Sequence, residues 1–410
     1  MAPNNALGKP TAAKIRERAE RRASRSPAPQ RRASSPAPKR RPNKSASSES
    51  TTAMAKQDAF GAGGDLSAGS VVDAEAVASR GVGSAEKTPV DEFEERTAHE
   101  GEIRNFFTGL MFVTRLPCPG WCDHHPGYLM RSMAWFPLLG TIVGIWAAAW
   151  FDAAATLWSP FLAAVLSHGA TLWLTGCFHE DGLADTIDGF GGGWTKAQIL
   201  RIMKDSRVGS YALMGGSLWA LGKAIAAGSL GESTWRLCGG GGGGPAILVA
   251  HTVARASSAP LIYFCKYVTD DEDVKGEFYN WFAECERLLG WRRVLFAWVS
   301  SLAIACLVLP PAPAAAAVIT GVAVSVLAGF YGNSVLGGVM GDFLGATICM
   351  AELAIYLVLS ADVARLASVA SQQGLGAALF PFVLLSLIVS APQVYAKYIR
   401  TGEIVDAKEC

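Results

Sequence analysis

An acidic segment at residues 175–211 carries the side chains of this sequence best suited to chemistry. It reads TGCFHEDGLADTIDGFGGGWTKAQILRIMKDSRVGSY and directly follows an apolar run. If the segment is helical, Asp181, Asp185 and Asp188 recur at spacings of four and three residues and share one face. Glu180 then points about 100° away from that face, as the helical period requires. The spacing therefore predicts a row of carboxylates at the end of an apolar segment.

Three like charges on one helical face repel one another, and an isolated carboxylate beside a membrane is costly. A divalent cation resolves both problems. Mg²⁺ prefers hard oxygen ligands, and it commonly takes one or two carboxylates together with substrate phosphates. The pattern therefore favours a Mg²⁺–phosphate site at Asp181, Asp185 and Asp188, with Glu180 assisting. An acidic loop exposed to water is the alternative. Flanking glycines, Gly189 among them, would let backbone or substrate approach closely.

The next residues predict a short amphipathic helix that carries cations. Thr195 and Gln198 form the S/T-x-x-Q pattern of a capping box, and apolar residues follow at helical spacing. Cations beside a carboxylate cluster can hold pyrophosphate and stabilise charge during phosphoryl transfer. Anchoring to anionic lipid headgroups is the alternative, although it explains the tight KDSR run at 204–207 less well. The cations in question are Lys196, Arg201, Lys204 and Arg207.

Ionisable residues also occur inside later apolar runs. Asp342 and Glu352 lie at the start of and within GGVMGDFLGATICMAELAIYL, and intramembrane acids are functional candidates by default. His251 and Arg255 are one helical turn apart in another apolar run, where together they could pair with an acid or a phosphate. A lone Arg near the end of a span more often extends toward the interface.

The composition indicates a membrane protein. Half of the 410 residues are hydrophobic and 17% are charged, whereas soluble domains carry about 25% charged residues. Apolar runs near the ~20 residues that a spanning helix needs recur along the chain, and they are too continuous for barrel strands. We expect an all-α, polytopic bundle of about seven transmembrane helices, with one candidate re-entrant or interfacial and an interfacial helix at 102–116. The candidates are 133–151, 157–178, 211–230, 245–265, 293–310, 314–331, 344–360 and 376–396.

Residues 1–100 differ sharply from the membrane domain expected at 101–400. Residues 1–45 hold 13 Lys and Arg against two Asp and Glu, so the remainder carries a net charge of −10. Such an acidic body argues against nucleic-acid binding. The Arg-, Ser- and Pro-rich extension predicts disorder. Its composition also fits a transit peptide to a mitochondrial or plastid membrane. A tail without targeting value, on a protein of the cell inner membrane, is the alternative.

These stretches together resemble the cobalamin synthase family. The strongest similarity is HEDGLADTIDGF at 179–190 followed by RIMKDSRVGSY at 201–211, in both residues and spacing. Four further segments fall in the family's order, and the similarity covers roughly 103–397. Those segments are TRLP at 114–117, FPLLG at 136–140, ARAS at 254–257 and GGVMGDFLGA at 337–346.

The resemblance implies a Mg²⁺-dependent membrane transferase. Its substrates would be adenosylcobinamide-GDP and α-ribazole or α-ribazole 5′-phosphate, and its products adenosylcobalamin or its phosphate and GMP. The hydroxyl proton would pass to His179 or Asp205, while Lys204 and Arg207 stabilise the phosphoryl oxygens. The metal set would be Glu180, Asp181, Asp185 and Asp188. The substrate-binding candidates are Arg115, Arg201, Gly189, Arg255 and Asp342.

Two other functions compete with this interpretation. A phosphotransferase of the CDP-alcohol type also clusters aspartates near the membrane. Its DGxxAR pattern fails here, because Asp181-Gly182 is followed by Leu183-Ala184-Asp185 and not by the Ala-Arg. A transporter with intramembrane carboxylates would often show inverted repeats, and we find no repeat. The sequence leaves the oligomeric state and the choice of acceptor open.

Overall fold

The computed structural model describes residues 87–122, 124–230, 243–268 and 284–361, together with single residues at 281, 368, 371, 372 and 376. Its elements are helical, and no named strand occurs among these residues; one isolated bridge joins Tyr267 to Val339. The elements are α2 (Pro89–Thr97), α3 (Ile103–Val113), α4 (Pro126–Ser132), the 3-10 turn η2 (Met133–Trp135), α5 (Phe136–Ala155), α6 (Pro160–Thr175), α7 (Phe178–Gly192), α8 (Lys196–Met203), α9 (Ser210–Leu230), α10 (Gly244–Ala256), α11 (Ser258–Phe264), α13 (Cys285–Val308), α14 (Pro311–Val335) and α15 (Gly341–Ser360).

The predicted polytopic helical fold is confirmed. Within the described ranges, five helical segments are long and apolar enough to cross a membrane, or six if the bent pair α6–α7 counts as one span. The candidate span at 211–230 forms α9, which is not among the five; its glycines, serines and Lys223 make it less apolar. The candidate at 376–396 lies outside the described residues, apart from residue 376. The five are 126–155, 244–264, 285–308, 311–335 and 341–360.

A sharp break separates α6 from α7. Gly176 and Cys177 both have left-handed backbone conformations, with φ of 67° and 59°, and the two helices bend by 96° there. Glycine adopts this conformation readily, whereas a residue with a side chain rarely does. The apolar run therefore ends at the break, and the acidic segment continues as a separate helix in a new direction.

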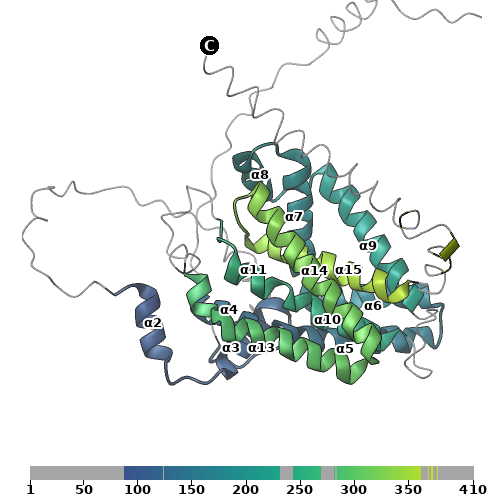
Figure 1. Cartoon of the computed structure of the whole chain (residues 1–410), viewed down its shortest axis with the longest axis horizontal. Helices are drawn as coiled ribbons and strands as arrows, with labels where there is room; N and C mark the ends of the chain where they lie inside the picture. Colours follow the sequence, from purple (N-terminus) through teal and green to yellow (C-terminus); the bar gives the residue numbers. More distant parts are fainter. Residues whose placement is uncertain are drawn as a thin grey trace, which may run out of the picture. The chain divides into compact units, whose positions relative to one another are not determined.

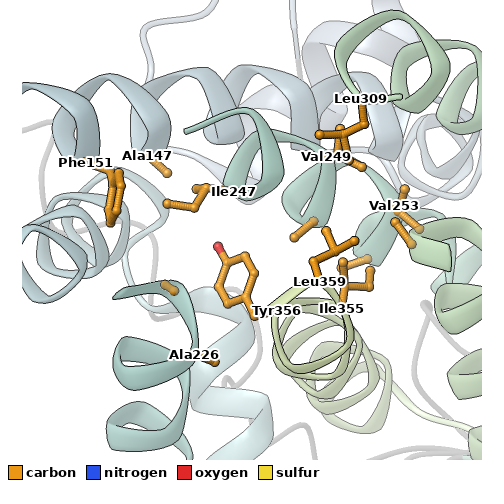
Figure 2. Close-up of a cluster of buried hydrophobic side chains, with 14 of the residues drawn as sticks. Ala147, Phe151, Ala226, Ile247, Val249, Val253, Leu309, Ile355, Tyr356 and Leu359 are labelled. Atoms are coloured by element: carbon orange, nitrogen blue, oxygen red, sulfur yellow. The ribbon is translucent and has the colours of Figure 1, made fainter. Parts of the chain in front are cut away.

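The centre of the bundle is packed with small and branched side chains. Figure 2 shows residues of α5, α9, α10 and α15 converging, with Tyr356 of α15 near Ala226 and Ile247. Alanines from these helices are fully buried, which lets the backbones approach closely. Many large apolar side chains on the outer faces of α9, α13 and α14 are exposed, as expected of surfaces that face lipid.

The folded part begins before residue 101, within the segment assigned above to the extension. Thr88 and Asp91 form a capping box that starts α2. Phe93 of α2 is buried between His125, which it stacks on, and the edge of Trp281. Helix α2 thus packs onto the membrane domain, and the expectations for residues 1–86 fall outside the described residues.

The connections at one end of the bundle are held together. Arg115 donates its backbone N–H to Leu174 at the end of α6, at 2.8 Å. Val268, after α11, donates to the carbonyl of Val339, before α15, also at 2.8 Å. Figure 1 shows α8 lying beside α7 at this end. The motif segment and the GGVMGD segment are therefore parts of one region.

Candidate active site

Helix α7 lies directly against the start of α15. A Cβ atom on Gly182 would lie 2.7 Å from the Asp342 carbonyl oxygen, and one on Gly345 would lie 3.2 Å from that of His179. Gly182 therefore has no room for a side chain where the two helices touch, and Gly345 has little. The contact brings the carboxylates of the motif segment next to Asp342, which is 161 residues later than Asp181 in the chain.

Asp181, Asp185 and Asp342 form the exposed acidic set of this site. Asp181 is exposed, while Asp185 and Asp342 are partly buried. The three carboxylates are close enough to interact electrostatically, and none of them has an ion-pair partner within the described part of the chain. No group of three or more His, Cys, Asp or Glu side chains among the described residues is arranged to hold a metal by itself. Any cation here would need further ligands from substrate or water.

Asp188 has a different role from the one predicted by helical spacing. It lies on the same helix, but its carboxylate accepts hydrogen bonds from the backbone N–H groups of Gly209 at 2.6 Å and Ala212 at 2.8 Å. These are free N–H groups at the start of α9, which a side-chain oxygen commonly satisfies. Asp188 therefore joins the end of α7 to α9, a use that helical spacing did not indicate, and its role as a metal ligand stays a prediction.

Gly189 is also reassigned by its surroundings. It is buried under α8, where a Cβ atom would lie 2.5 Å from Met203 Cγ and 3.3 Å from Ile199 Cγ2. Its missing side chain therefore serves helix packing, and its predicted contact with substrate stays a prediction. The predicted capping box of α8 is confirmed, with Thr195 accepting from the Gln198 N–H. The cations of this segment, Lys196, Arg201, Lys204 and Arg207, are exposed.

Asp205 and Arg207 neutralise each other in the loop between α8 and α9. The guanidinium donates from Nε at 2.9 Å and from Nη2 at 2.5 Å to the carboxylate. These hydrogen bonds and the backbone N–H of Arg207 lower the pKa of Asp205 to about 2. A carboxylate with so low a pKa is a weak base at neutral pH. The geometry therefore argues against Asp205 as proton acceptor.

Arg115 lies at the break before α7. Its guanidinium packs over Gly176, where a Cβ atom would lie 3.0 Å from Nε. It acts electrostatically on Cys177, as do Glu180 and Asp181, so it belongs to the same region as the acidic set. The structure thus brings this candidate cation from the TRLP segment to the beginning of the motif helix.

A second charged cluster is buried inside the bundle. Glu352 accepts from Lys223 Nζ at 2.6 Å and from Arg255 Nη1 at 2.9 Å, and lies 2.7 Å from His251 Nδ1. All four side chains are at most 3% exposed. The expectation that His251 and Arg255 could pair with an acid is confirmed. The Arg255 guanidinium is buried in this network, which we call the Glu352 network, and substrate binding by Arg255 stays a prediction.

Sequence reasoning missed Lys223 of the Glu352 network. A single Lys in an apolar helix has no evident role in the sequence unless its partner is known. That partner, Glu352, is 129 residues away in the chain. The signal that could have found it is the rule that intramembrane charges pair with one another. Applied to Glu352, that rule requires a cation in another span.

His179 and Glu180 lie in the first turn of α7. His179 is buried, and its Nε2 atom has no hydrogen-bond partner. Glu180 is partly buried, and its Oε2 atom likewise has no partner. As neighbours on a helix, Glu180 and Asp181 project in directions about 100° apart.

Comparison with known proteins identifies the family. A family model described as cobalamin-5-phosphate synthase matches residues 105–360. The chain belongs to the cobalamin-5-phosphate synthase family. Within this family, it is 35% identical over 279 residues to the adenosylcobinamide-GDP ribazoletransferase of Shewanella baltica, covering 65% of this chain and 97% of the relative. It is 37% identical over 260 residues to that of Shewanella amazonensis, covering 63% and 95%. No solved structure matches.

Membership of the cobalamin-5-phosphate synthase family makes the chain a transferase of the final step of cobalamin biosynthesis. It sets aside both the CDP-alcohol phosphotransferase and the transporter. The matched residues extend from α3 to the end of α15, so they include α7, α8 and the Glu352 network. Helix α2 precedes the matched region.

Proposed function

We propose that this chain transfers adenosylcobinamide phosphate from adenosylcobinamide-GDP to α-ribazole or α-ribazole 5′-phosphate and releases GMP. The ribazole hydroxyl oxygen forms the new bond to the phosphorus that bears the cobinamide. The bond from that phosphorus to the GMP oxygen breaks, and the hydroxyl proton passes to a base. The names of the relatives supply the donor and the acceptor class.

The observation that carries the proposal is the exposed acidic set beside a cationic helix. Asp181 and Asp185 of α7 lie next to Asp342 of α15, and the described residues provide no internal cation for any of the three. Carboxylates placed together in this way repel one another, and a bound cation relieves that repulsion. A diphosphate substrate brought in with a divalent cation meets that need, and it also places the scissile bond between the acids and the cations of α8.

The acidic set suits Mg²⁺ as the cofactor. Two or three carboxylates, too few and too loosely arranged for a preformed protein cage, match an ion that keeps water and phosphate oxygens as ligands. Asp181, Asp185 and Asp342 would hold it, and when bound it would offset charge on the leaving phosphate. Arg201 and Lys204, exposed on the adjacent helix, are placed to bind phosphate oxygens, and Arg115 does so from the break before α7. Arg207 contributes less while it is paired with Asp205.

The hydroxyl proton needs a base other than the carboxylates assigned to the cation. Asp205 is a weak base because of its pair with Arg207. His179, the other predicted base, is buried and its Nε2 atom has no hydrogen-bond partner. Of the two predicted bases, His179 is therefore the one that we assign.

We further propose that the site faces the cytoplasm, or the matrix or stroma if the protein occupies an organelle membrane. The described connections on the side of the bundle where α7 and α8 lie contain several Lys and Arg residues outside the spans. The described connections at the other end, 156–159, residue 243, 309–310 and residue 361, carry none. Loops rich in Lys and Arg stay on the side of insertion.

The test is a transfer assay on washed membranes. Adenosylcobinamide-GDP is supplied with α-ribazole or with α-ribazole 5′-phosphate, each with Mg²⁺ or with EDTA. We expect GMP and the matching cobalamin product to appear in equal amounts, only with Mg²⁺ and only with an acceptor. Comparing the two acceptors identifies the natural one.

Two outcomes would contradict the proposal. GMP release without acceptor would indicate hydrolysis instead of transfer. Absence of product with both acceptors, from membranes in which the chain is inserted and folded, would exclude the assigned reaction.

A further inference from the structure

A short extended segment after α11 is bonded to the chain just before α15. The backbone N–H of Val339 donates to the Lys266 carbonyl, and the N–H of Val268 donates to the Val339 carbonyl, both at 2.8 Å. These two bonds enclose Tyr267 and form the isolated parallel bridge between Tyr267 and Val339. The segment 266–268 therefore holds the residues that lead into α15.

The glycines of the GGVMGD segment make this close approach possible. A Cβ atom on Gly338 would overlap the carbonyl oxygen of Lys266, so a side chain has no room there. Gly337, the residue before it, has a left-handed φ of 76°, which glycine adopts without strain. The chain can therefore turn at these two residues and lie directly against 266–268.

The segment 266–268 also joins α8 to the start of α15. Neighbouring side chains of an extended segment point to opposite sides. Val268 belongs to a small buried cluster with Leu336 and with residues of α8, among them Met203. Tyr267 packs against a different cluster, which includes Phe343 of α15. The cationic helix and the first turn of α15 are thus attached to the same short stretch of backbone.

The hydroxyl of Tyr267 takes the place of a helix cap on α15. Gly341, the first residue of the helix, donates its backbone N–H to the Tyr267 oxygen at 3.1 Å. Met340, the N-cap residue, makes no side-chain cap hydrogen bond. The first N–H groups of a helix have no partner within it, so an acceptor from elsewhere stabilises that end. Asp342 of the exposed acidic set is the next residue, in the same turn.

We propose that Tyr267 is a positioning residue for the active site. Its hydroxyl holds the first turn of α15 and so sets where Asp342 lies relative to Asp181 and Asp185 of α7. Tyr267 acts through Gly341 and makes no contact with substrate. The expected effect on cation binding rests on the proposed function, while the effect on α15 is independent of it.

The first measurement is hydrogen–deuterium exchange of the detergent-solubilised Tyr267→Phe chain, followed by mass spectrometry. The substitution keeps the ring and removes the oxygen that accepts from Gly341. We expect faster exchange than in the wild type in peptides that cover 340–346. Exchange in α7 and α10 should be unchanged, because neither helix is bonded to this hydroxyl.

The second measurement follows the cation itself. Mn²⁺ takes the place of Mg²⁺ and is detected by electron paramagnetic resonance. With GDP present, Tyr267→Phe should bind Mn²⁺ about ten-fold more weakly than the wild type, because groups that orient a metal ligand commonly contribute this much to affinity. The Mg²⁺ concentration for half-maximal transfer should rise equally, and the maximal rate should recover at high Mg²⁺. A residue that only stabilised the fold would leave that midpoint unchanged.

Tyr263→Phe is the matched control. Tyr263 lies on α11 and is partly buried, and its hydroxyl has no hydrogen bond to any described residue. The control should change neither measurement. If Tyr267→Phe fails to fold, Gly341→Pro removes the donor in place of the acceptor. Proline is accepted at the first position of a helix, and the extended backbone of Met340 suits the residue before it. This variant should weaken Mn²⁺ binding in the same way.

Three results would overturn the inference. One is wild-type exchange in 340–346 of a folded Tyr267→Phe chain. Another is an equal increase across α7, α10 and α15, which would make Tyr267 a general stabiliser. The third is wild-type Mn²⁺ affinity in a chain whose 340–346 exchange has risen. If the wild type itself binds no Mn²⁺, the proposed cation site fails, while the exchange measurement still decides whether Tyr267 holds α15.

Discussion

Two sets of acidic residues differ in how their charge is balanced. Glu352 is buried and surrounded by Lys223, Arg255 and His251, so its charge is balanced from within. Asp181, Asp185 and Asp342 lie together at the end of the bundle with no ion-pair partner among the described residues. The same fold gives the Glu352 carboxylate three partners and gives the carboxylates of the exposed acidic set no ion-pair partner among the described residues. The difference indicates that the acidic set is completed by something the protein binds.

The largest effect should follow loss of a member of the exposed set. Asp185→Asn keeps the shape of the side chain but removes the charge, and we expect transfer to fall on the order of 1,000-fold, because cation and diphosphate lose a ligand. The chain should still insert and unfold as the wild type does. Product formation under saturating substrate measures the effect, and a rate within ten-fold of wild type would remove Asp185 from the site.

Substitution in the Glu352 network should mainly lower the stability of the fold, in contrast to substitution in the exposed acidic set. Glu352→Gln leaves Lys223 and Arg255 without their anion, and we expect a loss of about 3–5 kcal/mol in the free energy of unfolding. Unfolding of the detergent-solubilised chain by denaturant measures it. Glu352→Asp is the matched control, since it keeps the charge on a shorter side chain. Wild-type stability in Glu352→Gln would contradict the assignment of a paired buried network.

Asp342, the member of the acidic set on α15, tests whether this set binds Mg²⁺. If it helps to hold Mg²⁺, Asp342→Asn should raise the Mg²⁺ concentration for half-maximal transfer by about ten-fold, as loss of one supporting ligand commonly does. The maximal rate at high Mg²⁺ should recover in part. Titration of activity with Mg²⁺ checks this, and an unchanged midpoint would place Asp342 outside the metal site.

Asp188 should behave as a structural residue although it shares a helical face with Asp181 and Asp185. Asp188→Ala removes two hydrogen bonds to the start of α9, with an expected cost of about 1–2 kcal/mol. The Mg²⁺ midpoint should stay at its wild-type value. A shifted midpoint with unchanged stability would return Asp188 to the metal set.

The smallest effect is expected at the exposed pair of Asp205 and Arg207. The pKa of Asp205, about 2, is below its unfolded value of about 3.9. Any stabilisation from the pair is therefore present above pH ~4 and lost only as the pH falls toward 2. Asp205→Asn should leave both stability and the pH profile of transfer between pH 5 and 9 unchanged. If the pH–rate profile of Asp205→Asn lost its acidic or its basic limb in that range, Asp205 would be identified as the base.

The sequence predicted well where the signal was local. The spacing of Asp181 and Asp185, the capping box at Thr195 and the order of the apolar runs depend on neighbouring residues, and the structure has the corresponding helices. Local spacing failed at Asp188, because nothing within α7 reveals that the chain returns at Gly209 to use its carboxylate. A shared helical face is therefore not sufficient evidence that side chains bind the same ligand.

Long-range pairing was harder to predict for the same reason. Glu352 was recognisable as a buried acid, but the choice among His251, Arg255 and Lys223 as its partners depends on how α9, α10 and α15 pack. A glycine beside carboxylates fits substrate approach as well as helix packing. The position of Met203 over Gly189 shows the packing role, which the sequence could not give.

Binding of Mn²⁺, a spectroscopic substitute for Mg²⁺, tests the central claim most directly. Electron paramagnetic resonance of the purified chain with GDP present would follow the ion in the wild type, in an Asp181→Asn/Asp185→Asn variant and in Asp152→Asn, a control carboxylate of α5. We predict bound Mn²⁺ in the wild type and the control and little or none in the double variant. Equal binding by all three chains would contradict an external cation held by the exposed acidic set.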